Sequence, residues 1–403
     1  MTVHPAIIRW MSREGAVIVG AGPSGAATAL VLSQAGHAVT VLDRTCFPRD
    51  KPCGEGLMPP GVAALRRLGL LDAVLATKAP RIRGVMYTHI GGKPSAYATF
   101  PAPADGSDAW GLGVRRTTFD AVLVDALRRA PRVTLLEGVR ATGVIRGPSG
   151  VVTGVTTGDG PVLGGAVIAA DGLHSPTRAS AGLTGPFETT GRYGLAGHWH
   201  VDVADVDRIT VTFADRQEWY QAPVGPELLL VSTLADRARI GRTARTYATD
   251  AHAALPRLRD AELTGPPLAA GQFRQRPRAV AAAGLFLVGD AAGYDDPTTG
   301  EGIGIGLLLA ERVGRHVAAF LSGETDRDAA EARYRDDHSK LWRNRNRLTA
   351  LALLMARHPT LSRRAVARAS SRPHALATLL GINCGYWGFG RLTTRDWLTL
   401  AGL

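Results

Sequence analysis

A glycine-rich turn between an apolar strand and a small-residue helix constrains the fold of this chain more than any other feature. Residues 16–44 read AVIVGAGPSGAATALVLSQAGHAVTVLDR, which predicts a strand, a turn, a helix and a second strand. Gly20, Gly22 and Gly25 follow the G-x-G-x-x-G spacing. The first permits a tight turn, the second lets the backbone approach a pyrophosphate, and the third lets the helix lie close on the sheet. The stretch therefore predicts a dinucleotide-binding unit in an α/β domain.

The residues beside these glycines complete the predicted dinucleotide site. Pro23 and Ser24 begin the helix, whose free N–H groups and positive end would face the phosphates. Asp43 ends the second strand, 23 residues after Gly20, where a carboxylate can accept hydrogen bonds from both ribose hydroxyls of an adenosine. Arg44 follows it and is included among the candidate contacts.

Length and composition limit the kind of protein this is. A chain of 403 residues can form two or three domains, and 45% hydrophobic with 20% charged residues is typical of a soluble globular protein. No apolar run is long enough to span a bilayer and the first 14 residues lack a signal-peptide core, so we expect no transmembrane segment and a cytoplasmic location. Cys46, Cys53 and Cys384 have neither zinc spacing nor a disulfide pattern, so we expect free thiols.

The positive charge is concentrated near the end of the sequence. Of the net charge of +12, residues 341–403 contribute +9, from ten arginines and one acid, Asp396. Such a segment can attract nucleic acid, anionic lipid, a phosphate-bearing substrate or an acidic carrier protein, or it can form only a solvated helical face. No nucleic-acid-binding motif accompanies it, so we do not expect nucleic acid as a partner.

A second glycine-rich strand-to-helix junction lies far along the chain. Its candidate residues are Gly289, Asp290, Pro297, Gly300, Gly302 and Ile303. A helix N-terminus there would stabilise negative charge on a reduced flavin ring, and an aspartate at the strand end is placed to hydrogen-bond a ribityl hydroxyl. A nicotinamide dehydrogenase needs no second junction of this kind, so the pattern favours FAD over NAD as the tightly held cofactor.

Three segments between the two junctions carry further candidate cofactor contacts. Residues 46–58 predict a loop that folds back over the cofactor and places Cys53 and Gly54 near its reactive ring. Arg116, with the arginine before it, precedes a predicted helix, where one of the two could reach the pyrophosphate. Asp171 follows an apolar strand and marks a return to the nucleotide-binding sheet.

Residues 183–272 predict a second, mostly antiparallel sheet, because their strands carry more aromatic residues and no glycine fingerprint. His200, Tyr220 and Pro223 are the candidate substrate contacts, and Tyr220 fits a core position equally well. His198 and His200 would share one face of a strand, but no third ligand is in view, so no metal site is expected.

Three motifs, taken in order along the chain, resemble those of a known flavoenzyme family. They are GAGPSG at 20–25, ADG at 170–172 and GDAAGYDDPTTGEGI at 289–303. Together they resemble the FAD-dependent oxidoreductases with the p-hydroxybenzoate hydroxylase-like fold. The segments FPRDKPCGEGL and TGEGI look most like the geranylgeranyl-reductase branch of that superfamily. The family's Arg-x-x-Phe-Asp pattern falls on residues 116–120, which favours Arg116 as the contact to FAD.

The resemblance implies the fold and its division into domains. We expect an α/β chain with a Rossmann-like FAD-binding domain of the glutathione-reductase type, an α+β substrate domain built on an antiparallel sheet, and a C-terminal helical region rich in arginine. The expected boundaries are 15–80, 114–182 and 273–325 for the FAD-binding domain, 81–113 and 183–272 for the substrate-binding domain, and 326–403 for the C-terminal region.

The chain also departs from two branches of the superfamily. The reductase branch carries a Tyr-x-Trp-x-Phe-Pro motif in its substrate domain, whereas residues 218–223 here read EWYQAP. The Trp-x-Trp-x-Ile-Pro motif of flavin-dependent halogenases is missing, so we do not expect halogenation.

The resemblance implies a FAD-dependent oxidoreductase acting on a bulky, largely apolar or aromatic small molecule. We expect a monooxygenase of secondary metabolism that hydroxylates or epoxidises this substrate, with electrons from NAD(P)H or a partner flavin reductase. The alternative is a geranylgeranyl-reductase-like enzyme that passes a hydride to a carbon–carbon double bond. A second alternative is a non-enzymatic FAD-containing protein that binds a partner through its arginine-rich region. The sequence identifies no catalytic acid or base.

Overall fold

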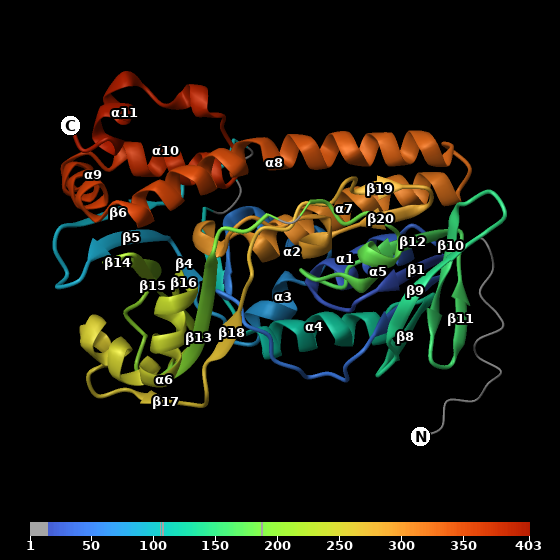
Figure 1. Cartoon of the computed structure of the whole chain (residues 1–403), viewed down its shortest axis with the longest axis horizontal. Helices are drawn as coiled ribbons and strands as arrows, with labels where there is room; N and C mark the ends of the chain where they lie inside the picture. Colours follow the sequence, from blue (N-terminus) through green and yellow to red (C-terminus); the bar gives the residue numbers. More distant parts are fainter. Residues whose placement is uncertain (1–14, 105, 107–108, 187) are drawn as a thin grey trace.

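Two large sheets lie at opposite ends of an elongated molecule, and a long helix runs beside both of them (Figure 1). The computed structural model describes residues 15–104, 106, 109–186 and 188–403. Within these residues the chain is a mixed α/β protein, as the sequence predicted. None of the helices in this described part is both long enough and apolar enough to cross a membrane.

The first sheet has six strands and is the nucleotide-binding type of sheet that the glycine motif predicted. Its strands, in spatial order, are β19 (Ala281–Ala282), β20 (Leu285–Leu287), β12 (Ala166–Ala169), β1 (Ala16–Val19), β2 (Val39–Asp43) and β8 (Val133–Glu137). All neighbouring pairs are parallel except β19 with β20. Strands β1, β2, β12 and β20 are buried along their whole length, which explains their nearly continuous apolar sequences.

Helices and a small antiparallel sheet cover this first sheet. The helices are α1 (Pro23–Gln34), α4 (Arg116–Arg129) and α7 (Gly302–Leu321), of which α1 packs against both of the others. The small sheet consists of β11 (Gly160–Leu163), β10 (Val152–Thr157) and β9 (Ala141–Arg146), and its middle strand packs against β12. Most of the largest hydrophobic cluster of the protein lies in these layers.

The second large sheet contains segments that are far apart in the sequence. Its strands, in spatial order, are β17 (Glu262–Leu263), β13 (Arg192–His200), β16 (Leu228–Asp236), β15 (Gln217–Gly225), β14 (Arg208–Ala214), β5 (Gly84–His89) and β6 (Ser95–Thr99), with β18 (Leu268–Ala270) also paired to β13. The sheet is antiparallel except where β5 joins β14 in parallel.

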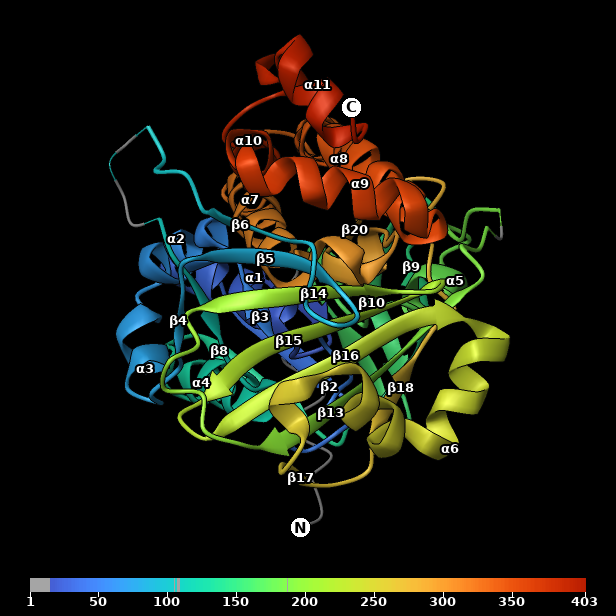
Figure 2. The same ribbon diagram turned by 90° about the vertical axis from the view of Figure 1, so that its left-hand side faces the viewer.

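The two faces of the second sheet pack against different helices. Helix α6 (Arg237–Ala254) covers one face, where Trp199, Trp219 and Tyr247 form an aromatic cluster. The C-terminal helices lie over β5, β6 and β14 on the other face (Figure 2). They are α8 (Arg327–Arg357), α9 (Pro359–Ser371), α10 (His374–Asn383) and α11 (Thr394–Leu400).

Short elements connect these layers. Three strands, β3 (Gly56–Leu57), β7 (Gly111–Gly113) and β4 (Arg81–Ile82), form a small sheet. The short helices are α2 (Pro59–Arg67), α3 (Leu71–Leu75) and α5 (Pro176–Ser180). The 3₁₀ turns are η2 (Pro256–Leu258), η3 (Gly289–Ala292), η4 (Pro297–Thr299) and η5 (Phe389–Arg391).

His338 on α8 makes the stability of this fold depend on acidity. Its ring lies between Tyr334 and Trp342, with ring centroids 6.4 and 5.6 Å away. Burial lowers the pKa of His338 from 6.5 to about 4. The unfolded chain therefore binds a proton in this range that the folded chain does not. We expect the free energy of unfolding to fall by about 2 kcal/mol as the pH drops from about 6.5 to about 4.

Substituting His338→Phe should remove this contribution. Urea unfolding of the variant at about pH 7 and about pH 5 is expected to show a smaller difference in unfolding free energy than the wild-type protein shows. The substitution His200→Phe removes an exposed histidine and is the control. An unchanged pH dependence in the His338→Phe protein would contradict the assignment.

Candidate functional site

The two glycine-rich junctions meet inside the protein. Helices α1 and α7 pack side by side, and Ser24 lies between them. A Cβ added at Gly289 or at Gly306 would collide with the Ser24 side chain. The turn after β1 and the turn after β20 therefore lie on one continuous surface, as a single extended ligand would require.

The first junction depends on close backbone contacts. Gly20 has φ +104°, and a Cβ there would overlap the carbonyl group of Ala170 at the end of β12. A Cβ on Gly25 would overlap the carbonyl oxygen of Gly20. Gly22 has room, since a Cβ there would meet only Arg49, with one guanidinium nitrogen 3.5 Å away. Helix α1 begins at Pro23 directly after this open glycine, so its first N–H groups face the same space.

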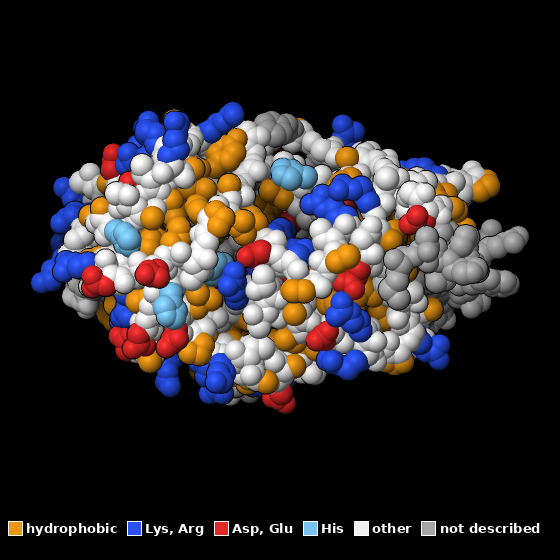
Figure 3. All heavy atoms as spheres, turned by 90° about the horizontal axis from the view of Figure 1, so that it is seen from below, with side chains coloured by type: hydrophobic (Ala, Val, Ile, Leu, Met, Phe, Trp, Pro, Cys, Tyr) orange, Lys and Arg blue, Asp and Glu red, His pale blue; other side chains and the backbone are white. Residues whose placement is uncertain are grey.

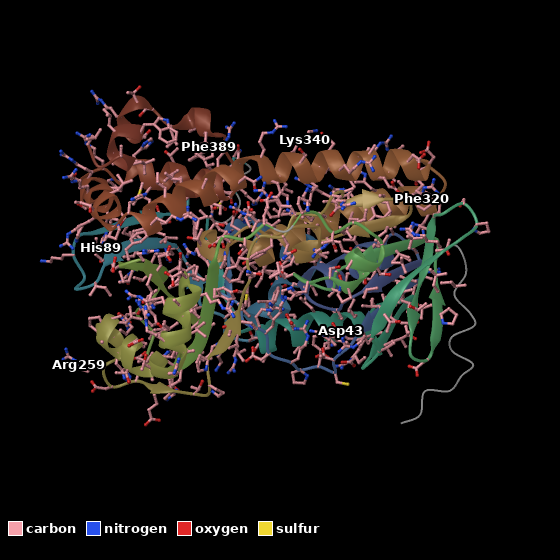
Figure 4. The ribbon with its side chains drawn as sticks, in the orientation of Figure 1. Asp43, His89, Arg259, Phe320, Lys340 and Phe389 are labelled. Atoms are coloured by element: carbon pink, nitrogen blue, oxygen red, sulfur yellow. The ribbon has the colours of Figure 1, made fainter. Side chains whose placement is uncertain are left out.

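Asp43 lies at the end of β2 beside this turn (Figure 4). One carboxylate oxygen accepts the N–H of Ala21 at 2.9 Å, and the other accepts the N–H and hydroxyl of Thr45 at 2.9 and 2.7 Å. The carboxylate is thus held in place by neighbours on the turn itself. Arg44, the next residue, is exposed.

Arg49 is a candidate contact that the sequence did not reveal. Its guanidinium lies 3.9 Å from the carboxylate of Asp43 and 3.6 Å from that of Asp120. It therefore supplies positive charge beside Gly22, where a pyrophosphate would need it. Arg49 comes from an irregular loop without periodicity or motif, so no local pattern could have predicted its position.

The Arg116 side chain is buried and forms an ion pair with a carboxylate. Its guanidinium forms two hydrogen bonds with Asp120, at 3.0 and 2.9 Å, one helical turn later. Its backbone N–H donates to Glu55 at 2.8 Å. The side chain thus lies at the start of α4, next to the loop that carries Cys53.

The loop that follows β2 joins the two large sheets. Glu55 adopts φ +53° and is 2% exposed, and its second carboxylate oxygen lies 2.8 Å from Nε2 of His198 on β13. The N–H of Glu55 donates to the Cys53 sulfur at 3.3 Å. Burial raises the pKa of the Cys53 thiol, so the neutral thiol is favoured. Gly54 has open space on its side-chain face.

Asp290 and Lys51 connect the second junction to this loop. The Lys51 ammonium lies 3.4 Å from the Asp290 carboxylate and also approaches Gly172. The turn continues through η4, which begins at Pro297, and through Gly300, with φ +68°, to the start of α7 at Gly302. Ile303 follows in the first turn of that helix and is buried.

The Asp171 carboxylate accepts hydrogen bonds from residues of its own loop. One carboxylate oxygen accepts the Ser175 hydroxyl, and the other accepts the N–H of Thr177 at 2.9 Å. Arg178 then donates to the carbonyl of Ala291 at 2.9 Å and so ties this loop to the turn after Asp290. Ser175 caps α5, and the Asp171 carboxylate holds this cap and the first turn of the helix in place.

An apolar cavity lies between the second sheet and the C-terminal helices, and it ends at the η4 turn. Its volume is about 160 Å³, and it opens to solvent. Alternating residues of the strands face it, such as Val211 and Phe213 of β14. Helix α8 contributes Leu351 and Met355. The lining is mostly hydrocarbon, which suits a bulky apolar ligand.

One of the three predicted substrate contacts lines this cavity. Tyr220 does so, and its hydroxyl lies 2.9 Å from that of Thr298 in η4. Pro223 and His200 are not among the described residues that line the cavity. Pro223 is three residues from Tyr220 and therefore faces the other side of the strand. His200 is exposed at the end of β13, which β16 and β15 separate from β14.

The residues around the junctions suit a flavin dinucleotide. Open backbone at Gly22, the start of α1 and the cation Arg49 suit an anionic pyrophosphate. Asp43 and Asp290 supply carboxylate acceptors for hydroxyl groups at the two ends of such a ligand. The apolar cavity borders the η4 turn, which lies beside the second junction.

Comparisons with known proteins agree with this geometry. The sequence model of the FAD binding domain family matches residues 14–344. The chain is 32% identical to the menaquinone reductase of Mycobacterium tuberculosis over 354 residues, which cover 81% of this chain and 78% of that protein. It is 26% identical to the 6-methylpretetramide 4-monooxygenase of Streptomyces rimosus over 353 residues, which cover 82% and 81% of the two chains.

Solved structures show the same fold. The p-nitrophenol 4-monooxygenase of Pseudomonas putida superposes with a TM-score of 0.78 at 22% identity, covering 96% of this chain and 98% of that one. A flavoprotein/dehydrogenase of Cytophaga hutchinsonii superposes with a TM-score of 0.78 at 20% identity, covering 92% and 93%.

The chain belongs to the FAD binding domain family. It is a FAD-binding oxidoreductase with the fold of the flavoprotein monooxygenases, so the family and fold predicted from the sequence motifs are confirmed.

Proposed function

We propose that FAD is held by the residues predicted from the two junctions, with Arg49 in addition. The adenosine end lies at Gly20–Gly25 and Asp43, and the ribityl and ring end lies at Asp290 and the start of α7. This proposal is supported by the contact of α1 with α7 and by the position of Arg49 beside Gly22. We also propose the division into a FAD-binding domain, a substrate-binding domain and a C-terminal helical region at the boundaries predicted above.

We propose that the protein is a monooxygenase that hydroxylates or epoxidises a bulky, largely apolar or aromatic small molecule of secondary metabolism. The observation that carries this proposal is the apolar cavity that ends at the Pro297–Gly300 turn. Bound FAD would supply oxygen activation or hydride transfer. The chain's own residues would position the substrate between β14 and α8 and exclude water from the reacting end of the cavity.

Reduction of a carbon–carbon double bond is the second candidate. It is favoured by the 32% identity to menaquinone reductases and by the Cys53–Gly54–Glu55 loop, in which a neutral thiol lies beside the second sheet. The same cavity would hold a polyprenyl chain in an extended form. The two candidate reactions therefore use the same site. They differ in whether the electrons of the reduced flavin go to oxygen or to a carbon–carbon double bond.

The deciding experiment uses the purified yellow protein with NADH, NADPH or an added flavin reductase as electron donor. With a polyprenyl quinone or a fused-ring aromatic substrate, a monooxygenase consumes oxygen in proportion to product, and the product gains one oxygen atom. A reductase forms a product two hydrogens heavier without air. A flavin that none of these donors reduces would contradict both candidates.

The cavity can be tested separately from the flavin. Ala352 on α8 lines the cavity, and the substitution Ala352→Trp should fill part of it. We expect normal FAD content and a roughly tenfold or greater loss of turnover of the apolar substrate. The control is Ala350→Trp, since Ala350 lies two residues away on the same helix and is exposed. Equal activity of the two variants would exclude this cavity as the substrate site.

A further inference from the structure

The C-terminal helices carry an unusual set of exposed positive charges. Asp396, the one acid of residues 341–403, is buried and accepts hydrogen bonds from Thr393. Arg345 is buried and paired with Glu301. The other arginines of the segment are exposed, and none has a carboxylate within 4 Å in the described chain: Arg343, Arg347, Arg357, Arg363, Arg364, Arg368, Arg372, Arg391 and Arg395.

Elsewhere the surface charges of both signs are mixed. Arg67 pairs with Glu311, and Arg257 pairs with Asp205. The face seen in Figure 3 shows Lys and Arg side chains interspersed with Asp and Glu. Exposed arginines without a carboxylate partner also occur elsewhere, for example on α6, but the described C-terminal helices from residue 341 onward are distinguished by exposing no acidic side chain among their arginines.

Large apolar side chains are exposed among these arginines. Trp397 and Leu398 on α11 and Leu354 on α8 are 43%, 44% and 44% exposed, and Leu403 is 64% exposed. Stacked side chains connect α11 to α8, since the Trp397 ring stacks on Phe389 with centroids 6.2 Å apart and the Arg347 guanidinium lies 5.9 Å from the Phe389 ring centroid.

The exposed residues of α8 continue this surface. Arg343, Arg347, Leu354 and Arg357 are separated by four, seven and three residues, so they follow one side of the helix. On α9, Arg364 lies against Gly402, next to Leu403. We call the nine exposed arginines together with Leu354, Trp397, Leu398 and Leu403 the C-terminal face.

We propose that the C-terminal face docks the protein on the surface of an anionic lipid bilayer. Arginines with no acidic neighbours are attracted to the negative headgroups, and tryptophan and leucine side chains between them can enter the interface. An acidic carrier protein would complement the same charges, but the bilayer is favoured because the helices that carry these arginines also form the wall of the apolar cavity.

The same helices form the wall of the apolar cavity. Leu351 and Met355 of α8 and Leu400 of α11 line it from within, close in sequence to the exposed Leu354 and Leu398. Docking would therefore bring the helices that wall the cavity to the bilayer, and we infer that this shortens the route of a lipid-soluble substrate to the cavity. This route rests on the proposed function, whereas docking does not.

The test is sedimentation of the FAD-loaded protein with vesicles. With about one third phosphatidylglycerol in phosphatidylcholine, we expect binding roughly tenfold or more tighter than with phosphatidylcholine alone. Raising the salt from about 0.1 M to about 0.5 M should weaken the binding to anionic vesicles severalfold. Equal binding to both kinds of vesicle, or no binding to either, would overturn the proposal even if the enzyme is active in solution.

Two variants and a matched control locate the docking surface. R363Q/R364Q/R368Q and L354S/L398S should each lower the affinity for anionic vesicles roughly tenfold while FAD content stays unchanged. The control R237Q/R242Q/R245Q removes three exposed arginines from α6, on the opposite face of the second sheet, and should bind like the wild type. Loss of binding in the control alone, or full binding by both C-terminal variants, would overturn the assignment of this face.

Discussion

The substitution Gly25→Ala is expected to give a protein that has lost most of its FAD and is destabilised by about 3 kcal/mol. A Cβ at this position would overlap the carbonyl oxygen of Gly20 and approach the Ala170 side chain to 3.0 Å. Both contacts are with the residues that directly follow β1 and β12, so α1 must move away from the sheet. That movement would shift the first turn of α1, where the phosphates would bind.

The effect can be measured by flavin absorbance per protein and by thermal unfolding. The matched control is Gly241→Ala, because Gly241 lies in α6 with nothing within 4 Å of its added Cβ. Alanine there should be neutral or stabilise α6 by about 0.5 to 1 kcal/mol. A Gly25→Ala protein with full FAD content and unchanged stability would show that α1 does not pack as described.

The substitution Arg192→Met is expected to destabilise the protein by about 3 to 5 kcal/mol. The guanidinium of Arg192 donates to both carboxylate oxygens of Glu218, at 3.2 and 2.7 Å, and lies 3.4 Å from Asp296. The side chains of both acids are almost fully buried. Without Arg192, two buried carboxylates would lose the guanidinium that contacts both of them.

The pH dependence of the Arg192→Met protein is a second expected result. Burial raises the pKa of Glu218 to about 7 even with Arg192 present, and removal of the cation must raise it further. A folded-state pKa above the unfolded value of 4.5 means that stability is lost as the pH rises through this range. The variant should therefore lose more stability than the wild type between about pH 5 and about pH 8.

A double substitution separates the lost charge from a general packing defect. R192M/E218L removes one of the two uncompensated carboxylates together with the cation and should recover part of the loss measured by denaturant unfolding. Arg257→Met breaks the more exposed pair with Asp205 and should have a much smaller effect on the free energy of unfolding. If Arg192→Met costs no more than Arg257→Met, the buried network of Arg192, Glu218 and Asp296 does not stabilise the protein.

The sequence predicted both strand-to-helix junctions because each depends on a local requirement. Gly20 and Gly289 adopt positive φ angles, and Gly25 has no space for a side chain. Such requirements leave a fixed spacing in the sequence. The helices and most strands around them were predictable for a similar reason, since burial on one or both faces sets the period of the apolar residues.

The candidate site was predictable only in part. Arg49 and Lys51 come from a loop without periodicity, and only the fold places them beside Asp43 and Asp290. Strand alternation gives the face on which Tyr220 lies but not which strand borders a cavity. That depends on the order of strands in the second sheet and on the helices α8 to α11 that close over β5 and β14.

The sequence by itself therefore determined the family, the cofactor class and the two glycine-rich junctions at which we propose that the backbone approaches that cofactor. The tertiary structure decided where the substrate cavity lies, which charges are compensated, and which arginines remain exposed together. The physical reason is that glycine turns and helix starts act over a few residues, whereas a cavity or a charged surface is formed by side chains from segments distant in the sequence.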